Sequence, residues 1–397
     1  MIYNPRKEPS IFEHQHLKVL WVTNLAAPYR VPVWRDLGRR CDLTVALLES
    51  NAGLQRDAAA NRGQDWHHQT SQDFIFAELP AWKVSRGESR FYFLKSIKAA
   101  MSVSRYNVVL FGGWESPAYW VLMLACMVSR TARVAFYESP KNTMTHTSGP
   151  VSFLRAGFFR CMNKIVVPGA AAYEAVTGMG VRPNNVLQGF NAVDVRAFHE
   201  AALSEGDRAA NKAPNGHSYL YVGQLIDRKR VQDIVDSFIR VAEQEDRLTI
   251  VGTGERLDEL KKLAGAHEAQ ISFLGHVENS ELPKIMAAHH TLVLASNREV
   301  WGLVVNEALA SGMHVVVTEN CGVSRSVRSM HGVHIVTEDL QDLGEQMKIS
   351  RNKWTGRVQS PEILQYTPAH FAEVFYEAFK TAQGAPTCAA ENCAVRG

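Results

Sequence analysis

Short apolar runs alternate with longer amphipathic stretches along the first half of the chain. The runs are rich in Val, Ile, Leu and Phe, as expected for parallel strands that are covered on both faces. They occupy 17–23, 43–48, 74–79, 108–111, 132–137 and 164–167. Most of the stretches between them are long enough for a crossover helix. The pattern predicts an open, doubly wound α/β sheet.

A polar break separates this half from a second alternating series. Residues 200–218 contain Glu, Asp, Lys, Asn, Pro and Gly with few large apolar side chains, which predicts a linker. Strand candidates then resume at 219–222, 248–251, 271–274, 291–294, 314–318 and 333–336. We therefore expect an α/β fold of two facing Rossmann-like domains, with a ligand site in the cleft between the carboxyl ends of their sheets.

The end of the chain predicts one more helix and a tail. Residues 368–382 start with a proline and carry apolar side chains at helical spacing. Beyond them the chain is small and polar, which predicts disorder, with Cys388 and Cys393 as incidental thiols. The expected division is 1–200 for the first domain, 201–217 for the linker, 218–365 for the second domain, 366–383 for the C-terminal helix and 384–397 for the tail.

Hydropathy gives no sign of a membrane span. The longest apolar run, 118–128, has eleven residues, whereas a bilayer span needs about twenty. We interpret it as a buried helix. Residues 1–16 are polar and lack the apolar segment of a signal peptide.

Composition narrows the function classes. The 397 residues are 46% hydrophobic and 21% charged, which is typical of soluble globular domains. A net charge of +3 argues against nucleic-acid binding. The six cysteines show neither zinc-ribbon spacing nor the density of a secreted disulfide scaffold, so we expect a cytoplasmic protein.

The most informative segment is 296–312, with the sequence SNREVWGLVVNEALASG. It places Glu299 in a turn after a predicted strand, followed by Gly302 and an apolar helix that carries Glu307. A helix N-terminus binds anions, because its first N–H groups lack intrahelical partners and its dipole is positive there. We expect a diphosphate at this terminus, Glu299 beside the group beyond the phosphates, and Glu307 as the acceptor for paired ribose hydroxyls. In the alternative, Glu299 caps the helix and Glu307 faces solvent.

Two glycine turns accompany that segment. Gly223 and Gln224 follow the first strand of the second half, with Lys229 close behind. Glycine allows close backbone approach to a ligand, and a lysine at a helix start can meet phosphate. The alternative is an ordinary solvated basic helix start. Gly252-Thr253-Gly254 also follows a strand, but Leu at position 257 leaves the dinucleotide fingerprint incomplete.

Together these pieces resemble the retaining glycosyltransferases of family 4, which have the GT-B fold. The resemblance rests above all on Glu299-x7-Glu307 followed by Ala308-x-Ala310-x-Gly312. Supporting matches are Gly223 with Lys229, Gly252-x-Gly254, Phe273-x-Gly275, Ser296, Asn24 with Pro28-Tyr29-Arg30, Gly112-Gly113, Glu138-Ser139, Val167-Pro168-Gly169 and Asn191-Ala192-Val193-Asp194. The matches extend over nearly the whole chain.

The resemblance implies roles for particular residues. Lys229 is implied as a diphosphate contact, Glu299 as a partner of donor-sugar hydroxyls and Glu307 as a partner of the ribose. The implied donor site also includes Gly223, Gln224, Gly252, Gly254, Gly302, Leu303 and Val304. There are two departures from the family pattern. Gln224 stands where many relatives carry an arginine, with Arg228 or Arg230 as the candidate replacement, and Ala26-Ala27 replaces a common glycine pair.

The resemblance also implies the chemistry. It implies retention of anomeric configuration, with the departing phosphate taking the proton of the acceptor hydroxyl and with no metal or other cofactor required. The acceptor is expected on the first domain, near residues that follow predicted strands. These are Arg30, Gly113, Trp114 and Glu138, with Glu115, Tyr137 and Lys141 nearby. The alternative for each is an ordinary loop residue. The histidine pairs 67–68 and 289–290 are expected to be surface or core histidines.

Two further stretches, 86–98 and 151–164, mix basic and aromatic residues as interfacial helices do. The alternative is that they are solvated helix faces over a normal core.

From the resemblance we expect a cytoplasmic, metal-independent glycosyltransferase that moves a hexose from a UDP- or GDP-sugar to a glycan or polyprenyl-linked glycan in cell-surface polysaccharide assembly. Peripheral contact with the cytoplasmic face of a membrane fits such an acceptor. The alternatives are a nucleotide-sugar epimerase or hydrolase of the same fold, and a catalytically silent glycan- or partner-binding module.

Overall fold

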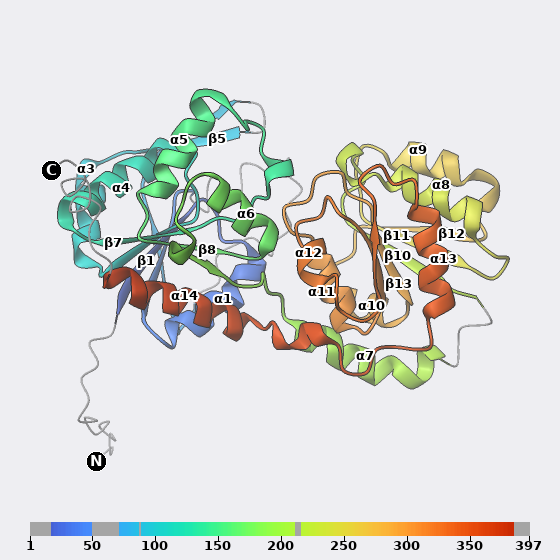
Figure 1. The fold of residues 1–397 in the computed structure, drawn as a ribbon. Helices are drawn as coiled ribbons and strands as arrows, with labels where there is room; N and C mark the ends of the chain where they lie inside the picture. Colours follow the sequence, from blue (N-terminus) through green and yellow to red (C-terminus); the bar gives the residue numbers. More distant parts are fainter. Residues whose placement is uncertain (1–16, 50–70, 87–88, 211–215, 385–397) are drawn as a thin grey trace, which may run out of the picture.

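The first domain is built on a parallel sheet of seven strands in the order β3-β2-β1-β6-β7-β8-β9. The computed structural model describes residues 17–49, 71–86, 89–210 and 216–384 (Figure 1). The strands are β1 (Lys18–Thr23), β2 (Asp42–Leu47), β3 (Ile75–Glu78), β6 (Val108–Phe111), β7 (Ala132–Phe136), β8 (Lys164–Val167) and β9 (Val186–Gln188). All of the strands expected in this half are confirmed. Within this sheet only β9, a short strand at its edge, was not anticipated.

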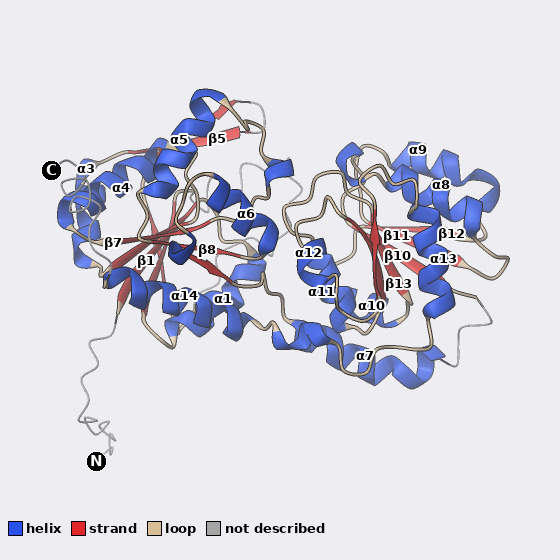
Figure 2. Ribbon diagram, in the orientation of Figure 1, coloured by secondary structure: helices blue, strands red, loops and turns tan. Residues whose placement is uncertain are grey.

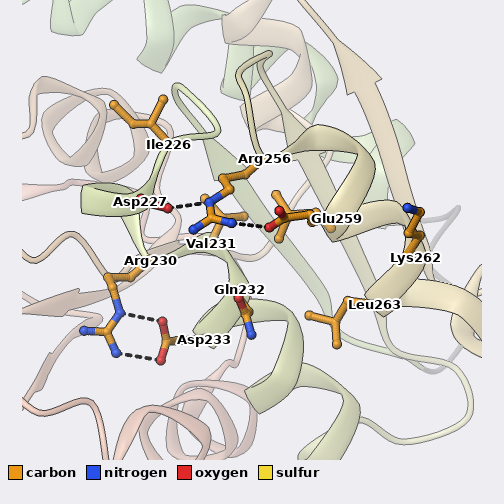
Figure 3. Close-up of a pocket in the computed structure, with 11 residues that line it drawn as sticks. Ile226, Asp227, Arg230, Val231, Gln232, Asp233, Arg256, Glu259, Lys262 and Leu263 are labelled. Carbon is orange, nitrogen blue, oxygen red and sulfur yellow. Dashed lines mark hydrogen bonds and ion pairs between the residues drawn. The ribbon is translucent and has the colours of Figure 1, made fainter.

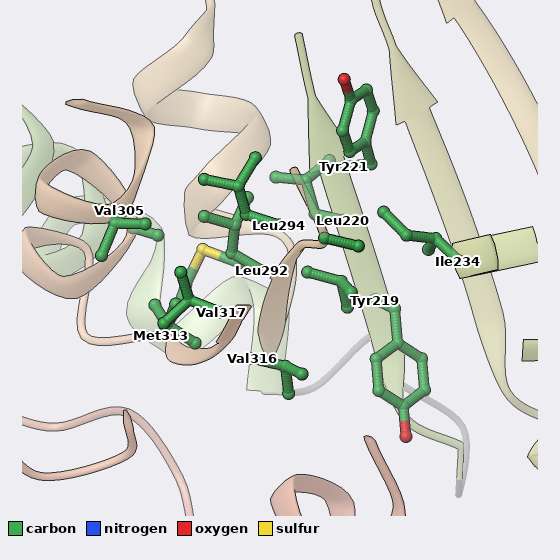
Figure 4. Packing of buried hydrophobic residues seen from close by; sticks show 14 of the residues in the cluster. Tyr219, Leu220, Tyr221, Ile234, Leu292, Leu294, Val305, Met313, Val316 and Val317 are labelled. Atoms are coloured by element: carbon green, nitrogen blue, oxygen red, sulfur yellow. The ribbon is translucent and has the colours of Figure 1, made fainter. Parts of the chain in front are cut away.

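The second domain holds a parallel sheet of six strands in the order β12-β11-β10-β13-β14-β15. They are β10 (Ser218–Val222), β11 (Arg247–Val251), β12 (Ile271–Gly275), β13 (Thr291–Leu294), β14 (His314–Thr318) and β15 (Val333–Val336). Every strand predicted here is confirmed. Figure 4 shows how side chains of β10, β13 and β14 pack with Val305 of a neighbouring helix in one apolar core.

Helices cover both faces of each sheet, so the central strands are continuously apolar, as the sequence pattern required (Figure 2). The helices are α1 (Val31–Gly38), α3 (Ile97–Met101), α4 (Pro117–Ser129), α5 (Gly149–Arg160), α6 (Ala170–Gly178), α7 (Val195–Ala210), α8 (Val231–Val241), α9 (Leu257–Ala264), α10 (Leu282–Ala287), α11 (Leu303–Ala310), α12 (Ser324–Val327), α13 (Leu343–Lys353) and α14 (Pro368–Gln383). The predicted C-terminal helix is thus present as α14.

Helix α14 returns to the first domain, although it follows the second domain in the chain (Figure 1). The Phe375 ring lies 4.7 Å from Trp21 of β1 and 5.4 Å from Phe136 of β7 between ring centroids. Its apolar face therefore completes the core of a sheet that lies far upstream in the sequence.

Much of the predicted linker is helical. Helix α7 covers Val195–Ala210 and packs against α10 and α11 of the second domain. Phe198 and Ala202 are buried on its inner face, and His199 Nδ1 lies 3.2 Å from the carbonyl oxygen of Ala310. The linker therefore begins as a regular helix and not as an irregular segment. Residues 211–215, the tail from 385 with Cys388 and Cys393, and the histidine pair 67–68 lie outside the described residues.

The interpretation of residues 86–98 as helical was wrong. This stretch belongs to an antiparallel hairpin, β4 (Ala81–Arg86) and β5 (Ser89–Leu94), followed by α3. Side chains alternate between the two faces of the hairpin, as in any β-strand. Trp82 and Val84 are exposed on one face, whereas Tyr92 is buried on the other and donates a hydrogen bond of 2.8 Å to Glu49. The other stretch, 151–164, does begin as a helix, within α5.

The apolar run 118–128 forms α4 as expected, but the helix is not fully buried. Val121, Leu124 and Val128 are exposed, while Leu122 and Cys126 lie in the core. A uniformly apolar helix carries no periodic signal that distinguishes its two faces, so the sequence alone could not reveal the exposed one. In the described part of the chain, no helix has the length and apolar character needed to cross a membrane.

Candidate active site

The floor of the candidate site consists of glycine turns at the carboxyl ends of β10, β11 and β12. A Cβ on Gly252 would lie 1.8 Å from the carbonyl oxygen of Gly223, and one on Gly254 would lie 2.3 Å from that of Leu225. The Gly252 amide donates to the Gly275 carbonyl at 2.7 Å. The turns therefore need glycine in order to pack against one another, which is a structural reason beside the implied role in donor binding.

Lys229 and Glu299 meet at this edge as an ion pair between Nζ and Oε2. Lys229 ends the short helix η7 (Asp227–Lys229) after β10, and Glu299 lies in the loop after β13, the neighbour of β10 in the sheet. Both side chains are mostly buried, at 13% and 16% exposure. Ser296 Oγ also donates to Glu299 Oε2, at 3.4 Å. The structure thus brings together two charged residues that the sequence singled out separately.

The N-terminus of α11 follows Glu299 directly. Gly302, its N-cap, has a φ of 97°, a left-handed conformation that favours glycine. The next amides, those of Leu303 and Val304, are at helix positions that have no intrahelical acceptor. No side chain caps this terminus, so Glu299 is not its cap. Its N–H groups are available to an anion.

A second loop holds the Glu299 turn in place. Glu299 and Cys321 form an isolated parallel β-bridge, and the Gly322 amide donates to the Glu299 carbonyl at 3.0 Å. A Cβ on Gly322 would lie 2.0 Å from the carbonyl oxygen of Val300. The sequence analysis did not single out Cys321 and Gly322. The only sequence feature that could have pointed to these two residues is a glycine shortly after a buried strand, as at the other glycine turns.

Glu307 lies on α11, and its carboxylate has no hydrogen-bond partner among the described residues, although its backbone carbonyl accepts from Ser311. It is half-buried, and burial raises its pKa to about 7. The alternative in which Glu307 simply faces solvent is therefore wrong. A carboxylate without a partner, on the helix that offers its N-terminus to an anion, can accept hydrogen bonds from hydroxyl groups of a ligand.

On the first domain, Arg30 and Glu138 form a salt bridge of 2.8 Å. The Arg30 guanidinium also lies 4.5 Å from the centroid of the Phe136 ring. Trp114 follows β6, the neighbour of β7, and its carbonyl accepts a hydrogen bond of 2.9 Å from Trp120. These candidate acceptor residues therefore share the carboxyl edge of the first sheet.

Gly113 and Tyr137 are held by packing inside the first domain, unlike residues that contact an acceptor at the surface. A Cβ on Gly113 would lie 2.6 Å from the ring of Tyr119, so glycine is required there by packing. Tyr137 is buried, which raises its pKa to about 12. Glu115 accepts a hydrogen bond of 3.1 Å from Asn24, which follows β1.

Asn306 connects the two halves of the site. Its side-chain amide donates to the Asn191 carbonyl of the first domain at 2.6 Å, and its Oδ1 accepts from Trp301 Nε1 at 3.2 Å. Asn191 in turn donates to Glu138 at 3.4 Å. A chain of polar contacts thus runs from the Arg30–Glu138 pair to the loop that carries Glu299. Sequence reasoning missed Asn306, whose only signal was an amide inside an apolar helix.

The structure distinguishes between the cations near Gln224, which is itself exposed. Arg230 forms hydrogen bonds of 2.6 and 2.7 Å to Asp233. Arg228 donates to the carbonyl of Arg298, next to Glu299, at 3.4 Å. Of these two arginines, Arg228 contacts the loop that carries Glu299, whereas Arg230 is held by Asp233.

A groove of about 610 Å³ lies beside these loops, between η7, α8 and α9 (Figure 3). Its arginines are already paired: Arg256 contacts Asp227 and Glu259, and Arg230 contacts Asp233. The groove is not lined by Lys229, Glu299 or Glu307. We therefore take the uncapped N-terminus of α11, beside Lys229 and Glu299, as the candidate diphosphate site.

Metal-ligand clusters are not found in the part of the chain that the structure describes. His289, from the second histidine pair, makes contacts of 2.7 Å to the Ile285 carbonyl and 2.8 Å to Thr249. It is thus a hydrogen-bonded core histidine, as interpreted from the sequence.

Comparison with known proteins gives a family match for the second half of the chain. Residues 205–351 match the model of the glycosyl transferases group 1. The phosphatidyl-myo-inositol mannosyltransferase of Mycobacterium tuberculosis is 27% identical over 226 residues, which covers 56% of this chain and 57% of the relative. The N-acetyl-alpha-D-glucosaminyl L-malate synthase of Bacillus anthracis is 26% identical over 156 residues, which covers 38% of this chain and 40% of the relative. The chain thus spans about two fifths to three fifths of these relatives.

Solved structures agree over a longer range. Anabaena Alr3699/HepE in complex with UDP has a TM-score of 0.64 at 15% identity, covering 96% of this chain and all of that one. The lipopolysaccharide outer core galactosyltransferase WaaB, apo form, has a TM-score of 0.67 at 12% identity, covering 92% and 99%. The expected resemblance is therefore confirmed: residues 205–351 match the glycosyl transferases group 1 model, and the chain has the GT-B fold.

Proposed function

We propose that the chain is a retaining, metal-independent hexosyltransferase that uses a UDP- or GDP-sugar as donor. The observation that carries the proposal is the Lys229–Glu299 pair at the uncapped N-terminus of α11. One cation, a set of aligned amides and two carboxylates on either side suit a nucleotide sugar, which has a diphosphate flanked by two polyhydroxyl groups. The Anabaena neighbour, whose structures carry UDP and UDP-glucose, supports a donor of this class.

In this proposal the donor lies with its diphosphate on the amides of Leu303 and Val304. Lys229 contacts the phosphates, Glu299 accepts hydrogen bonds from the sugar, and Glu307 accepts them from the ribose. The bond between the sugar carbon and the phosphate oxygen breaks, and its electron pair stays on the diphosphate. Amides and a cation aimed at that oxygen stabilise the charge as it develops.

The acceptor is proposed to bind to the first domain, near Arg30, Trp114 and Glu138. Its hydroxyl oxygen forms the new bond to the sugar carbon, and its proton passes to the departing phosphate oxygen. No protein base is needed for that transfer. Glu138 is held by Arg30 and Asn191, so it is positioned to orient hydroxyl groups.

The acceptor class is proposed to be a glycan or polyprenyl-linked glycan, in cell-surface polysaccharide assembly. This assignment is supported by the similarity to a phosphatidyl-myo-inositol mannosyltransferase and to a lipopolysaccharide outer core galactosyltransferase. Such an acceptor places the protein in the cytoplasm, in peripheral contact with the membrane.

A thermal-shift panel with UDP, GDP and their sugars tests the donor. A ligand at one hundred times its dissociation constant stabilises the folded state by about 2.7 kcal/mol. We expect a clear rise in melting temperature with one nucleotide series, and release of the nucleoside diphosphate only when an acceptor glycan is added. Release without acceptor would identify a hydrolase, isomerised donor would identify an epimerase, and no shift with any nucleotide would identify a silent binding module.

A further inference from the structure

The first domain carries an extensive apolar surface on adjoining elements. Most large apolar side chains that are exposed in the described residues belong to this domain. Those on the hairpin, α3 and α4 are Trp82, Val84, Phe93, Ile97, Met101, Val121, Leu124, Met127 and Val128, which we call the apolar face. Exposure reaches 59% for Trp82, 77% for Ile97 and 78% for Val128. A contiguous exposed surface of this kind marks an interaction site.

The residues of the apolar face lie next to one another. Trp82 and Phe93 are direct partners in the antiparallel register, so their side chains share one side of the hairpin. A groove of about 460 Å³ is lined by Trp82, Phe93, Ile97 and Val121, which joins the hairpin to α3 and α4. Figure 1 shows α3 and α4 at the end of the first domain that faces away from the second domain.

The charges on these elements have one sign. Residues 81–86, 89–105 and 117–130 contain Lys83, Arg86, Arg90, Lys95, Lys98, Arg105 and Arg130 and no Asp or Glu; one acid, Glu88, stands between the first two ranges. Arg86, Lys95, Lys98, Arg105 and Arg130 are exposed. None of these five forms an ion pair with a described residue. The molecule as a whole has a net charge of only +3, so the excess of positive charge is local.

We propose that the apolar face docks on an anionic lipid bilayer. Aromatic and aliphatic side chains enter the interface between headgroups and acyl chains, and the surrounding lysines and arginines contact the phosphates. A second copy of the chain would bring two positive faces together, which disfavours a dimer through this surface. The benefit of such docking rests on the proposed function. Helix α4 begins close to Trp114, a candidate acceptor residue, so docking would hold the acceptor-binding edge of the first sheet near a lipid-linked glycan.

Co-sedimentation with vesicles tests the proposal. Vesicles of phosphatidylcholine with and without phosphatidylglycerol are mixed with the purified protein at low and high salt. We expect binding to the anionic vesicles that weakens with salt. Lys95→Gln and Lys98→Gln should each weaken it about fivefold, and the double variant Ile97→Ser/Leu124→Ser by about tenfold or more.

Leu274→Ser is the matched control, because Leu274 is 49% exposed on β12 of the second domain. It should bind vesicles as the parent does. Melting temperatures of all variants verify that each remains folded.

Three outcomes would overturn the proposal: no binding to anionic vesicles, equal loss of binding in Leu274→Ser, or a dimer in gel filtration that Ile97→Ser dissociates while vesicle binding is absent. The nucleotide thermal shift, measured without vesicles, separates this inference from the proposed function. If no nucleotide raises the melting temperature but the protein still binds vesicles, the proposed function is wrong and the docking surface stands.

Discussion

At the residue scale, the Lys229–Glu299 pair is the feature on which donor binding depends. Lys229 already faces a carboxylate in the free protein, so a diphosphate meets a cation held in place by its neighbour. Lys229→Met should weaken nucleoside diphosphate binding about 10- to 100-fold, the range for loss of a charge-assisted hydrogen bond. Titration calorimetry measures it. Arg230→Met is the control, because Arg230 is paired with Asp233; equal losses in both variants would remove Lys229 from the site.

Glu307 predicts a pH dependence of donor binding. Its pKa is raised to about 7, so below that pH the free protein carries mostly the neutral acid. Ribose hydroxyls bind the carboxylate form better, and binding must then release a proton. The dissociation constant of the nucleotide should rise as the pH falls below 7, approaching about tenfold per pH unit.

Glu307→Gln removes the titrating group, so its dissociation constant should follow only the titration of the nucleotide itself. Calorimetry between about pH 5 and pH 8 gives both curves. Parallel curves for parent and variant would show that Glu307 does not contact the ligand.

Sequence and structure agree at this scale where the partners lie on one domain. The spacing of Glu299 and Glu307 around a helix start was enough to place both carboxylates. Asn306 could not be found in that way, because its partner is the backbone carbonyl of Asn191 on the other domain. Cys321 and Gly322 were missed for a similar reason, since a bridge between two loops leaves no pattern in either loop.

At the element scale, α11 is tied to the first domain through Asn306. Asn306→Leu would leave the Asn191 carbonyl and Trp301 Nε1 without partners, each at a cost of about 1–3 kcal/mol. We expect a lower free energy of unfolding in urea and a lower kcat, with the nucleotide dissociation constant little changed. Asn306→Gln, which keeps the amide, should restore part of both losses.

Asn142→Ala is the control for this prediction. Asn142 also crosses between the domains, to the Asn320 carbonyl at 3.0 Å, but lies in a more open position. Its removal should cost less than 1 kcal/mol or so. A stable and fully active Asn306→Leu would contradict the role given to this helix.

Helices and strands were predicted correctly where their hydrophobic pattern was strong. Buried parallel strands such as β13 and β14 are continuously apolar and were recognised. The β4–β5 hairpin was mistaken for a helix because basic and aromatic residues satisfy either period over so few residues. The exposed face of α4 was hidden by uniform hydrophobicity.

At the scale of the whole molecule, histidines at the amino ends of the second sheet limit acid stability. Burial lowers the pKa of His217 to about 3 and those of His290 and His334 to about 4, and neighbouring histidines contribute. In the unfolded chain they titrate near pH 6.5. The unfolded state therefore binds more protons below that pH, and stability falls as the pH drops from about 6.5 toward 4.

The melting temperature should fall steadily over that range. His334→Gln removes one of these titrating groups, so it should flatten the decline. The substitution breaks no hydrogen bond of Nε2, which has no partner among the described residues. Differential scanning calorimetry of parent and variant measures it. A melting temperature that stays constant down to about pH 5 would contradict the account.

The two-domain architecture was predictable from the repeated strand–helix alternation, but the path of the chain was not. Helix α14 leaves the second domain and completes the core of the first through Phe375, and no local pattern indicates which core an amphipathic helix joins. The same limit applied to α7, whose polar composition gave the appearance of a linker.

The most direct test is a crystal structure with UDP or GDP bound. The account predicts diphosphate oxygens within about 2.7–3.2 Å of the Leu303 or Val304 amides and of Lys229 Nζ, with ribose hydroxyls on Glu307. A nucleotide bound elsewhere, for example in the groove between α8 and α9, with the N-terminus of α11 empty, would contradict it.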